Sequence, residues 1–427
     1  MSPRTFPFVF AAVLLALSRA IIFAAPPPRS WPPDQFTPLS AARIAALPPD
    51  ERPAWQAYWD VSEQLTSRMP KRPMPDISPL HPLAGLPKGG IHTKGLRLDA
   101  PAAWYASAEA QTIADRVAAG QLPFGGWIKG MNYTQDVPSA KSAADAEAAT
   151  FDNDATIFEL RFLARVITAA GSNEERAAIW RAAFERGVRY VFTAQYPNGG
   201  FPQFYPLLGG YHDGVTFNDD AMTHALELLR DVALGKNEYA FASAAMREEA
   251  AARLDRGVQC VLATQLQDAD GRRTVWCQQY DPLTLHAAAA RNFEPIADCS
   301  RESAEIVLFL MSLPDPSPKV VDAVESAIAW FHKTALHDLR VRRAPADTRG
   351  EAVPAPGAPP LWARFYEPGT TTPIFGDRDR TIHYVLSEVS RERIAGYSWY
   401  TVAPSTAIAE FARWQKNLAG SSAKTSQ

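Results

Sequence analysis

The 427-residue sequence contains few cysteines, only Cys260, Cys277 and Cys299. Three thiols permit at most one internal disulfide and their spacing is not that of a zinc site, so we expect them to pack in the interior. A basic cluster is also missing, because lysine and arginine are scattered and the net charge is −3. This argues against nucleic-acid binding, which usually requires a basic stripe. A local group of arginines could still serve an anionic ligand.

Long apolar runs are absent beyond the N-terminus. Residues 6–17 are apolar, follow Arg4 and precede Ser18-Arg19-Ala20, as in a secretory signal peptide. We therefore predict a signal peptide over residues 1–20, with cleavage as late as residue 25. The mature protein is expected to be secreted, extracellular or periplasmic, and not held in a membrane. A membrane anchor is the alternative, but the run is short and is broken by Ser18-Arg19.

The remaining chain divides into three parts. Residues 21–100 are predicted to be a Pro-rich linker and a helical N-terminal extension, with a helix over 38–67. Residues 101–417 are predicted to form the main domain, and residues 418–427 a disordered tail. The sequence leaves open whether the extension packs against the main domain. We expect a monomer.

An internal repeat indicates the fold. Residues 187–195 (GVRYVFTAQ) recur as residues 257–265 (GVQCVLATQ), and each copy ends a helical stretch before a glycine-containing turn. A polar cluster and a strongly apolar helix follow each turn, whereas the helices between them carry more charge. Three inner and three outer helices in alternation predict an all-α fold with little β structure, an (α/α)₃ toroid. All inner helices then begin at the same end of the ring.

Carboxylates gather at the predicted starts of two inner helices. Asp152-Asn153-Asp154 precedes one helix and Asn218-Asp219-Asp220 precedes the next. Helix capping accounts for one or two such groups per helix. Four carboxylates at one end of a ring would repel each other unless a cation lay between them, and calcium suits loosely arranged oxygen ligands. We therefore predict a Ca²⁺ site here.

Arginines form a second set of candidates. Arg291 lies in a loop before the third inner helix, Arg364 is flanked by aromatic residues, and Arg378 stands between Asp377 and Asp379. Arginine binds carboxylates in a two-point geometry, and neighbouring aromatic rings suit a sugar. Pairing with adjacent acids is the competing interpretation, and it is strongest for Arg378. Together, a metal site and arginines indicate a polyanionic, oxygen-rich substrate.

A uronate polymer would fit this chemistry. Its C5 proton lies next to a carboxylate, and a cation bound there stabilises the enolate-like intermediate. A base then removes the proton and the 4-linked sugar leaves. No G-x-S-x-G motif and no convincing Cys/His pair offers a conventional nucleophile.

From about Trp104 to about Tyr400 the chain resembles the family 10 polysaccharide lyases, pectate lyases with an (α/α)₃ toroid. The resemblance is carried by seven motifs in order, GGWxK at 125–129, ATFDN at 149–153, QYPNGGFPQ at 195–203, TFNDDAM at 216–222, AR at 290–291, WARFY at 362–366 and DRD at 377–379. It implies calcium-assisted β-elimination of α-1,4-linked polygalacturonate to 4,5-unsaturated oligogalacturonides.

The resemblance also implies residue roles. Arg291 matches the catalytic base, an unusual choice that needs a lowered pKa or a poised proton path. The metal ligands are Asp152 with Asp219 or Asp220. The expected substrate contacts are Lys129, Asn153, Arg364, Tyr366 and Arg378. Asp154 stands where the family pattern has glycine, which adds a carboxylate near the metal, and Ile128 and Gly130 flank the lysine instead of proline and asparagine.

Two alternatives belong to other classes. A terpenoid-cyclase or prenyltransferase-like toroid shares the Gln-x-x-x-Gly-Gly-Phe pattern of residues 195–201. It would require an apolar cavity with an aspartate-rich motif. A non-catalytic oligogalacturonide-binding protein would keep Arg364 and Arg378 but tolerate the loss of Arg291.

Overall fold

The computed structural model describes residues 26–32, 36–68, 92–137, 148–170, 174–342 and 350–425. The predicted signal peptide and its cleavage sites lie outside these residues. In the part that is described, no helix is both long and apolar enough to span a membrane.

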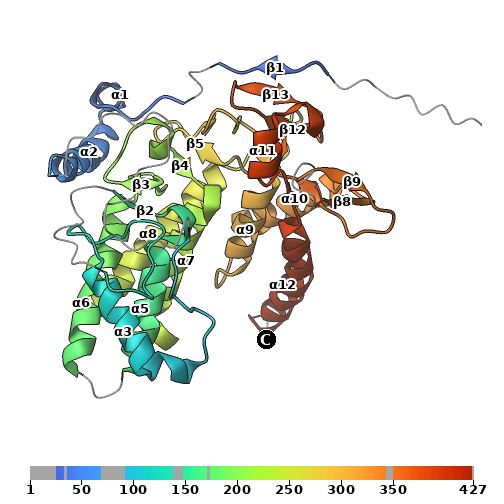
Figure 1. Cartoon of the computed structure of the whole chain (residues 1–427). Helices are drawn as coiled ribbons and strands as arrows, with labels where there is room; N and C mark the ends of the chain where they lie inside the picture. Colours follow the sequence, from blue (N-terminus) through green and yellow to red (C-terminus); the bar gives the residue numbers. More distant parts are fainter. Residues whose placement is uncertain are drawn as a thin grey trace, which may run out of the picture.

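Inner and outer helices alternate along the chain, which confirms the predicted all-α toroid (Figure 1). The inner helices are α5 (Ile157–Ala169), α7 (Ala221–Leu234) and α9 (Ser300–Met311). The outer helices are α6 (Glu174–Ala194), α8 (Ala244–Ala263) and α10 (Pro318–Thr334), with α3 (Ala108–Ala119) before them and α12 (Ala403–Thr425) after them. Each inner helix packs against the outer helix that follows it, and α7 contacts both α5 and α9. The inner helices are the more buried because their sequences are apolar on most sides.

A glutamine at the end of each repeat joins neighbouring outer helices. The Nε2 group of Gln195 donates to the Gly199 carbonyl at 3.0 Å and to the Arg253 carbonyl of α8 at 2.9 Å. Gln121 and Gln265 make the same pair of bonds, to α6 and α10 respectively. Because a buried carbonyl without a partner is costly, these amides stabilise each glycine turn against the next outer helix. The repeated final glutamine of GVRYVFTAQ and GVQCVLATQ thus has a structural role.

The strands are only two to four residues long and belong to the loops. One antiparallel sheet has the order β1-β13-β12-β11-β7, formed by Arg29–Ser30, Thr381–His383, Pro373–Gly376, Phe365–Tyr366 and Asp298–Cys299. Smaller sheets join β2 (Ala149–Thr150) to β3 (Phe204–Tyr205), and β4 (Val215–Thr216) to β5 (Gln279–Tyr280) and β6 (Ala287–Ala288). Two further pairs are β8 (Leu339–Val341) with β9 (Ala352–Pro354), and β10 (Trp362–Ala363) with β14 (Tyr400–Thr401). β2, β4 and β7 each lead into an inner helix, so these short pairs hold the helix starts together.

The N-terminal extension packs against the toroid. The predicted helix over 38–67 is in fact two helices, α1 (Ala41–Ala45) and α2 (Arg52–Thr66). Pro48-Pro49 separates them, because proline lacks an N–H and restrains the residue before it. The Tyr58 hydroxyl of α2 donates to the Ala194 carbonyl at 3.1 Å, and Ser62 accepts from the Leu207 N–H at 3.0 Å. These contacts decide a question that the sequence left open.

The end of the chain differs from expectation. Residues 418–427 were predicted to be disordered, but α12 continues to Thr425. The helix packs against α9 and α10. Cys260, Cys277 and Cys299 are all buried and unbonded, as predicted.

Candidate active site

Two inner helices begin with the same strained turn. Short 3₁₀ turns at Asp152–Asp154 and Asn218–Asp220 precede α5 and α7. Asn153 and Asp219 occupy matching places in these turns, with φ of 50° and 49° in the left-handed region. That conformation costs a non-glycine residue about 1 kcal/mol, and such strain clusters at functional sites. The two turns contact each other, so the structure brings the polar clusters together as the toroid predicts.

Asp152 lies at the centre of a hydrogen-bonded group. Its side chain is 4% exposed and forms an ion pair with Lys129. Gln203 donates from Nε2 to Asp152 Oδ1 at 3.0 Å, and Asn153 also donates to this carboxylate. Burial alone would raise the pKa of Asp152, but Lys129 and these donors outweigh it and hold the pKa below its usual value. Asp152 is therefore ionised, and Lys129 and Asn153, the expected substrate contacts, lie beside it.

Asp219 is the second carboxylate of the cleft. Burial, followed by the negative charge of Asp152, raises the pKa of Asp219 to about 6, against the opposing effect of Arg364. Asn218 donates to its Oδ2 at 2.8 Å. Lys129 pairs with Asp152 and Arg364 acts on Asp219, yet the pKa of Asp219 remains raised, so a cation added beside these two carboxylates would be favoured.

Asp220 and Asp154 face other partners. Arg301 donates to both oxygens of Asp220, at 3.0 and 2.8 Å. Asp154 lies 3.2 Å from His224 Nδ1 on α7. The four carboxylates thus have different partners: Arg301 pairs with Asp220, offered as an alternative ligand, and His224 pairs with Asp154, which leaves Asp152 and Asp219 as the pair that act on each other. In the described ranges no group of three histidine, cysteine or acidic side chains is placed to hold a metal ion.

Arg291 is held by a buried carboxylate. Its Nε donates to Glu294 Oε2 at 2.7 Å and its Nη2 to Oε1 at 2.5 Å. Glu294 is 2% exposed and also accepts from the Tyr397 hydroxyl at 2.7 Å. Burial lowers the pKa of Arg291, but the Glu294 carboxylate outweighs it and raises the pKa above its usual value. The lowered pKa expected for a base is thus not present in this state.

The other two arginines differ in burial. Arg364 is buried and donates from Nε to Glu302 Oε1 at 3.0 Å and from Nη2 to Asn218 Oδ1 at 3.0 Å. Its guanidinium lies 4.8 Å from the centre of the Tyr397 ring. Arg378 is 60% exposed and pairs with Glu392, not with the adjacent aspartates. Its guanidinium lies 5.5 Å from the Phe293 ring, two residues from Arg291, so Arg378 belongs to the rim of the same region.

Tyr366 is not available to a substrate. The side chain is fully buried, its hydroxyl donates to the Thr334 carbonyl at 2.8 Å, and the Ala363 N–H donates to it at 3.1 Å. The predicted substrate contact is therefore wrong. Alternation along β11 points Tyr366 into the helices under the site, where its ring packs edge-on against Trp330.

The family model for pectic acid lyase matches residues 121–408. The chain belongs to this family. A family 10 polysaccharide lyase from Cellvibrio cellulosa is 32% identical, with a TM-score of 0.64, over 73% of this chain and 95% of that one. A mutant of such a lyase from the same organism, solved with trigalacturonic acid, is 31% identical, with a TM-score of 0.65, over 75% of this chain and 99% of that one. No curated protein matches the chain.

The protein is thus a polysaccharide lyase, which sets aside both the terpenoid-cyclase alternative and the non-catalytic binding protein. Three residues that the sequence did not single out bond to the predicted site residues or to one another: Gln203 bonds Asp152, Glu294 bonds Arg291, and His212 bonds Gln203. Gln203 ends a motif and Glu294 follows Arg291 by three residues, so both carried a weak signal. His212 carried none, because its relation to Asp152 exists only through the fold.

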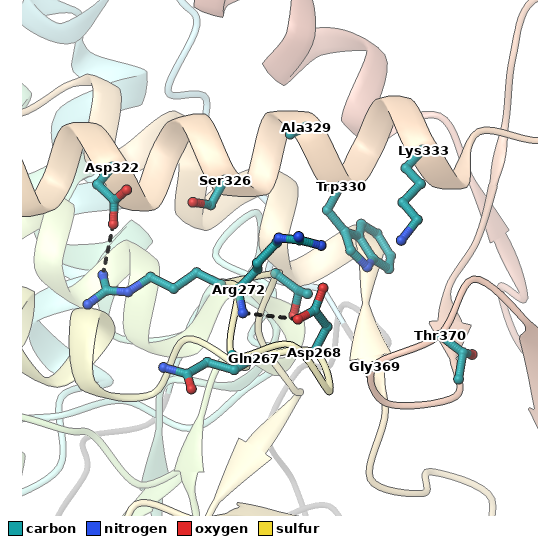
Figure 2. A pocket seen from close by; sticks show the side chains of 13 residues that line it. Gln267, Asp268, Arg272, Asp322, Ser326, Ala329, Trp330, Lys333, Gly369 and Thr370 are labelled. Carbon is teal, nitrogen blue, oxygen red and sulfur yellow. Dashed lines mark hydrogen bonds and ion pairs between the residues drawn. The ribbon is translucent and has the colours of Figure 1, made fainter.

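The lyase also has a cavity outside this site. It has a volume of about 590 Å³ and lies between α10 and the loop after α8 (Figure 2). Arg272, Trp330 and Lys333 line it, together with Asp322, which is ion-paired to Arg273 at 3.8 Å. None of the predicted site residues is among its lining residues.

Proposed function

We propose that this lyase is a pectate lyase that cleaves α-1,4-linked polygalacturonate by calcium-assisted β-elimination and releases 4,5-unsaturated oligogalacturonides. The observation that carries the proposal is the pair Asp152 and Asp219, whose carboxylates lie close enough for Asp152 to raise the pKa of Asp219. Arg364 also lies near Asp219, as does Glu294, the partner of Arg291. The trigalacturonic acid bound to the related lyase supports the same substrate class.

Asp152 and Asp219 fit a calcium site that substrate completes. Calcium takes about six to eight oxygen ligands, and two carboxylates leave places for water and for a uronate carboxylate. Arg364 offsets the charge of Asp219 only in part, since the pKa of Asp219 remains raised, whereas Asp220 is paired directly with Arg301. Calcium bound there would acidify the C5 proton by withdrawing charge from the adjacent carboxylate.

The chain's own residues would orient the substrate and move the proton. Arg364 and Arg378 would hold uronate carboxylates, the first from a fixed buried position and the second from the rim. Arg291 would take the C5 proton, the C4–O bond would break, and the C4=C5 double bond would form. The leaving oxygen would take a proton in turn.

Glu294 controls whether Arg291 can act in this way. Arginine accepts a proton only after losing one, and the ion pair opposes that loss. Tyr397 donates to the same carboxylate and Arg364 lies near it, so both draw charge away from Arg291. The group Arg291, Glu294, Tyr397 and Arg364 would therefore set the pH at which Arg291 becomes a base.

Absorbance of the unsaturated product tests the proposal. The purified protein is mixed with polygalacturonate in the presence of calcium and then of a chelator. A rise in ultraviolet absorbance that the chelator suppresses is expected. Absence of any rise with calcium over a broad alkaline range would refute pectate lyase activity, and a rise that persists with chelator would refute the metal requirement.

Export is part of the same proposal. A polymeric substrate lies outside the cell, and the N-terminal pattern of residues 1–20 is that of a signal peptide. The mature protein is expected outside the cytoplasm and as a monomer. N-terminal sequencing of the mature form should place the cleavage between residues 20 and 26.

A further inference from the structure

His212 lies in a fixed turn beside the cleft. The turn η3 (Gly210–Asp213) is held at two points: the Gln203 N–H donates to the His212 carbonyl at 3.0 Å, and Asp213 Oδ1 accepts from the Gly209 N–H at 2.9 Å. The imidazole ring packs between Tyr211 and Phe204, with ring centres 4.0 and 5.0 Å away. The ring therefore has one orientation.

The charges around His212 place it among the site residues. Asp152, Lys129 and Arg291 each influence its protonation. These are the ion-paired carboxylate, its lysine and the proposed base. Burial raises the pKa of the adjoining Tyr211, Arg291 lowers it, and Glu294 and Asp152 raise it further. The turn thus lies near the pair Asp152–Lys129 and also near the pair Arg291–Glu294.

A chain of hydrogen bonds fixes which imidazole nitrogen carries the proton. The Gln203 side chain presents its NH₂ group to Asp152, donating from Nε2 to Oδ1 at 3.0 Å. The Gln203 oxygen then faces His212 Nδ1 at 2.7 Å and must receive a proton from it. Neutral His212 therefore carries its proton on Nδ1 and has a lone pair on Nε2.

Nδ1 is bonded to Gln203, whereas Nε2 forms no hydrogen bond with any residue in the described part of the chain. Burial, together with Lys129 and Arg291, lowers the pKa of His212 to about 4, although Asp152 opposes the shift. The imidazole is consequently neutral at neutral and alkaline pH. A half-buried acceptor thus stands next to two cations.

We propose that His212 contacts the substrate and that its unprotonated Nε2 accepts a hydrogen bond from a sugar hydroxyl of the bound uronate. This rests on the proposed function. The cationic arginines and Lys129 can donate to carboxylates but offer no acceptor for a hydrogen bond from a hydroxyl. A lone pair repels a carboxylate, so His212 directs the hydroxyl side of a uronate toward Gln203 and Asp152. His212 would therefore be a neutral contact that orients the sugar among the charged contacts made by the arginines and Lys129.

Nitrogen NMR of the histidine side chains tests the tautomer in the full mature chain. The His212 signals are assigned by their loss in His212→Gln. The expected result is a proton on Nδ1 at neutral pH, and a change in the Nε2 signal when trigalacturonate is added to the inactive Arg291→Ala variant. A proton on Nε2, or an Nε2 signal that trigalacturonate leaves unchanged, would overturn the inference.

A matched pair of variants separates substrate contact from structural support. The amide of His212→Gln can reach the position of Nε2 and accept there, whereas the amide of His212→Asn reaches only the position of Nδ1 and can bond Gln203. Loss of one neutral hydrogen bond changes kcat/KM by about tenfold, so His212→Asn should fall by about that factor and His212→Gln should keep most of the activity. Equal losses, the reverse order or no loss in either variant would overturn the inference.

The outcomes also separate this inference from the proposed function. A wild-type protein without calcium-dependent release of unsaturated product would refute the function, whatever the tautomer. An active wild type in which His212→Asn retains full kcat/KM would leave the function standing and remove His212 from the substrate contacts. Unfolding curves serve as the control: His212→Gln, which loses the bond to Gln203, should be the less stable of the two variants, so a lower kcat/KM in His212→Asn cannot come from loss of the fold.

Discussion

Arg291 and Glu294 form a two-point ion pair, with Nε to Oε2 at 2.7 Å and Nη2 to Oε1 at 2.5 Å. The Glu294 carboxylate fixes the position of Arg291, the proposed base, and also stabilises its protonated form. Positioning and reactivity are therefore opposed in this pair. The pair holds Arg291 in place but raises its pKa, so Arg291 can act as a base only at higher pH.

Replacing Glu294 with glutamine should move the pH profile. Removal of the negative charge lowers the pKa of Arg291 toward its usual value, so the rise of kcat/KM with pH should shift to lower pH. Rates of β-elimination measured at fixed calcium across the alkaline range test this. Glu392→Gln is the matched control, because Glu392 makes a similar pair with Arg378 on the rim, and it should leave the profile in place. An unshifted profile in Glu294→Gln would exclude Arg291 as the group that sets it.

Arg291→Ala should abolish turnover and spare binding. A general base contributes about 10²- to 10⁴-fold to a rate, and kcat should fall by a factor in this range. Binding of trigalacturonate, measured by calorimetry, should change little because Arg364 and Arg378 remain. Arg378→Ala should show the opposite pattern, with a higher KM and nearly unchanged kcat. Turnover like that of the wild type in Arg291→Ala would end the assignment of the base.

Asp219 and Asp220 should respond differently to replacement by asparagine. Asp219→Asn keeps the left-handed backbone, which asparagine tolerates, but removes charge from the proposed calcium site. The calcium concentration for half-maximal rate should rise about tenfold or more, since affinity follows ligand charge. Asp220→Asn should leave that concentration unchanged and lower the free energy of unfolding by about 1 kcal/mol through its weakened bond to Arg301. The reverse pattern would assign the metal to Asp220.

Glu159 should make stability depend on pH. It is fully buried on α5, and burial raises its pKa to about 7 from 4.5. Between these pH values the folded protein keeps a proton that the unfolded chain has lost, so the free energy of unfolding falls as pH rises. The contribution of this one group is about 3 kcal/mol by linkage. Unfolding by denaturant at pH 5 and pH 8 should show a smaller decrease in Glu159→Gln than in the wild type, and an equal decrease would contradict the prediction.

Tyr366→Phe should affect stability and not catalysis. The change removes a buried hydroxyl that bonds Thr334 and Ala363, and the loss in free energy of unfolding should be about 1–2 kcal/mol. KM for polygalacturonate should match that of the wild type. A several-fold higher KM at unchanged stability would restore Tyr366 to the substrate contacts.

Much of the fold was predictable because it is local and repeated. The apolar inner helices, the glycine turns and the final glutamines of GVRYVFTAQ and GVQCVLATQ recur in sequence, and each copy folds in the same way. Asp152 and Asp219 were predictable for the same reason, since both lie at the start of such a helix. The break at Pro48-Pro49 carried a local signal as well. The continuation of α12 to Thr425 had no such signal in the sequence.

The partners of the charged residues needed the tertiary structure. Asp219 and Asp220 are adjacent in sequence, but a left-handed turn sends one toward Asp152 and the other toward Arg301. The direction of Tyr366 depends on the register of β11 against β7 and β12. The tautomer of His212 depends on Asp152, sixty positions away, acting through Gln203. The sequence alone determined the helices, their order and the residue types at the cleft, because these follow from local pattern. The fold decided which charges are neutralised and which remain for a ligand, because that depends on distances between segments far apart in the chain.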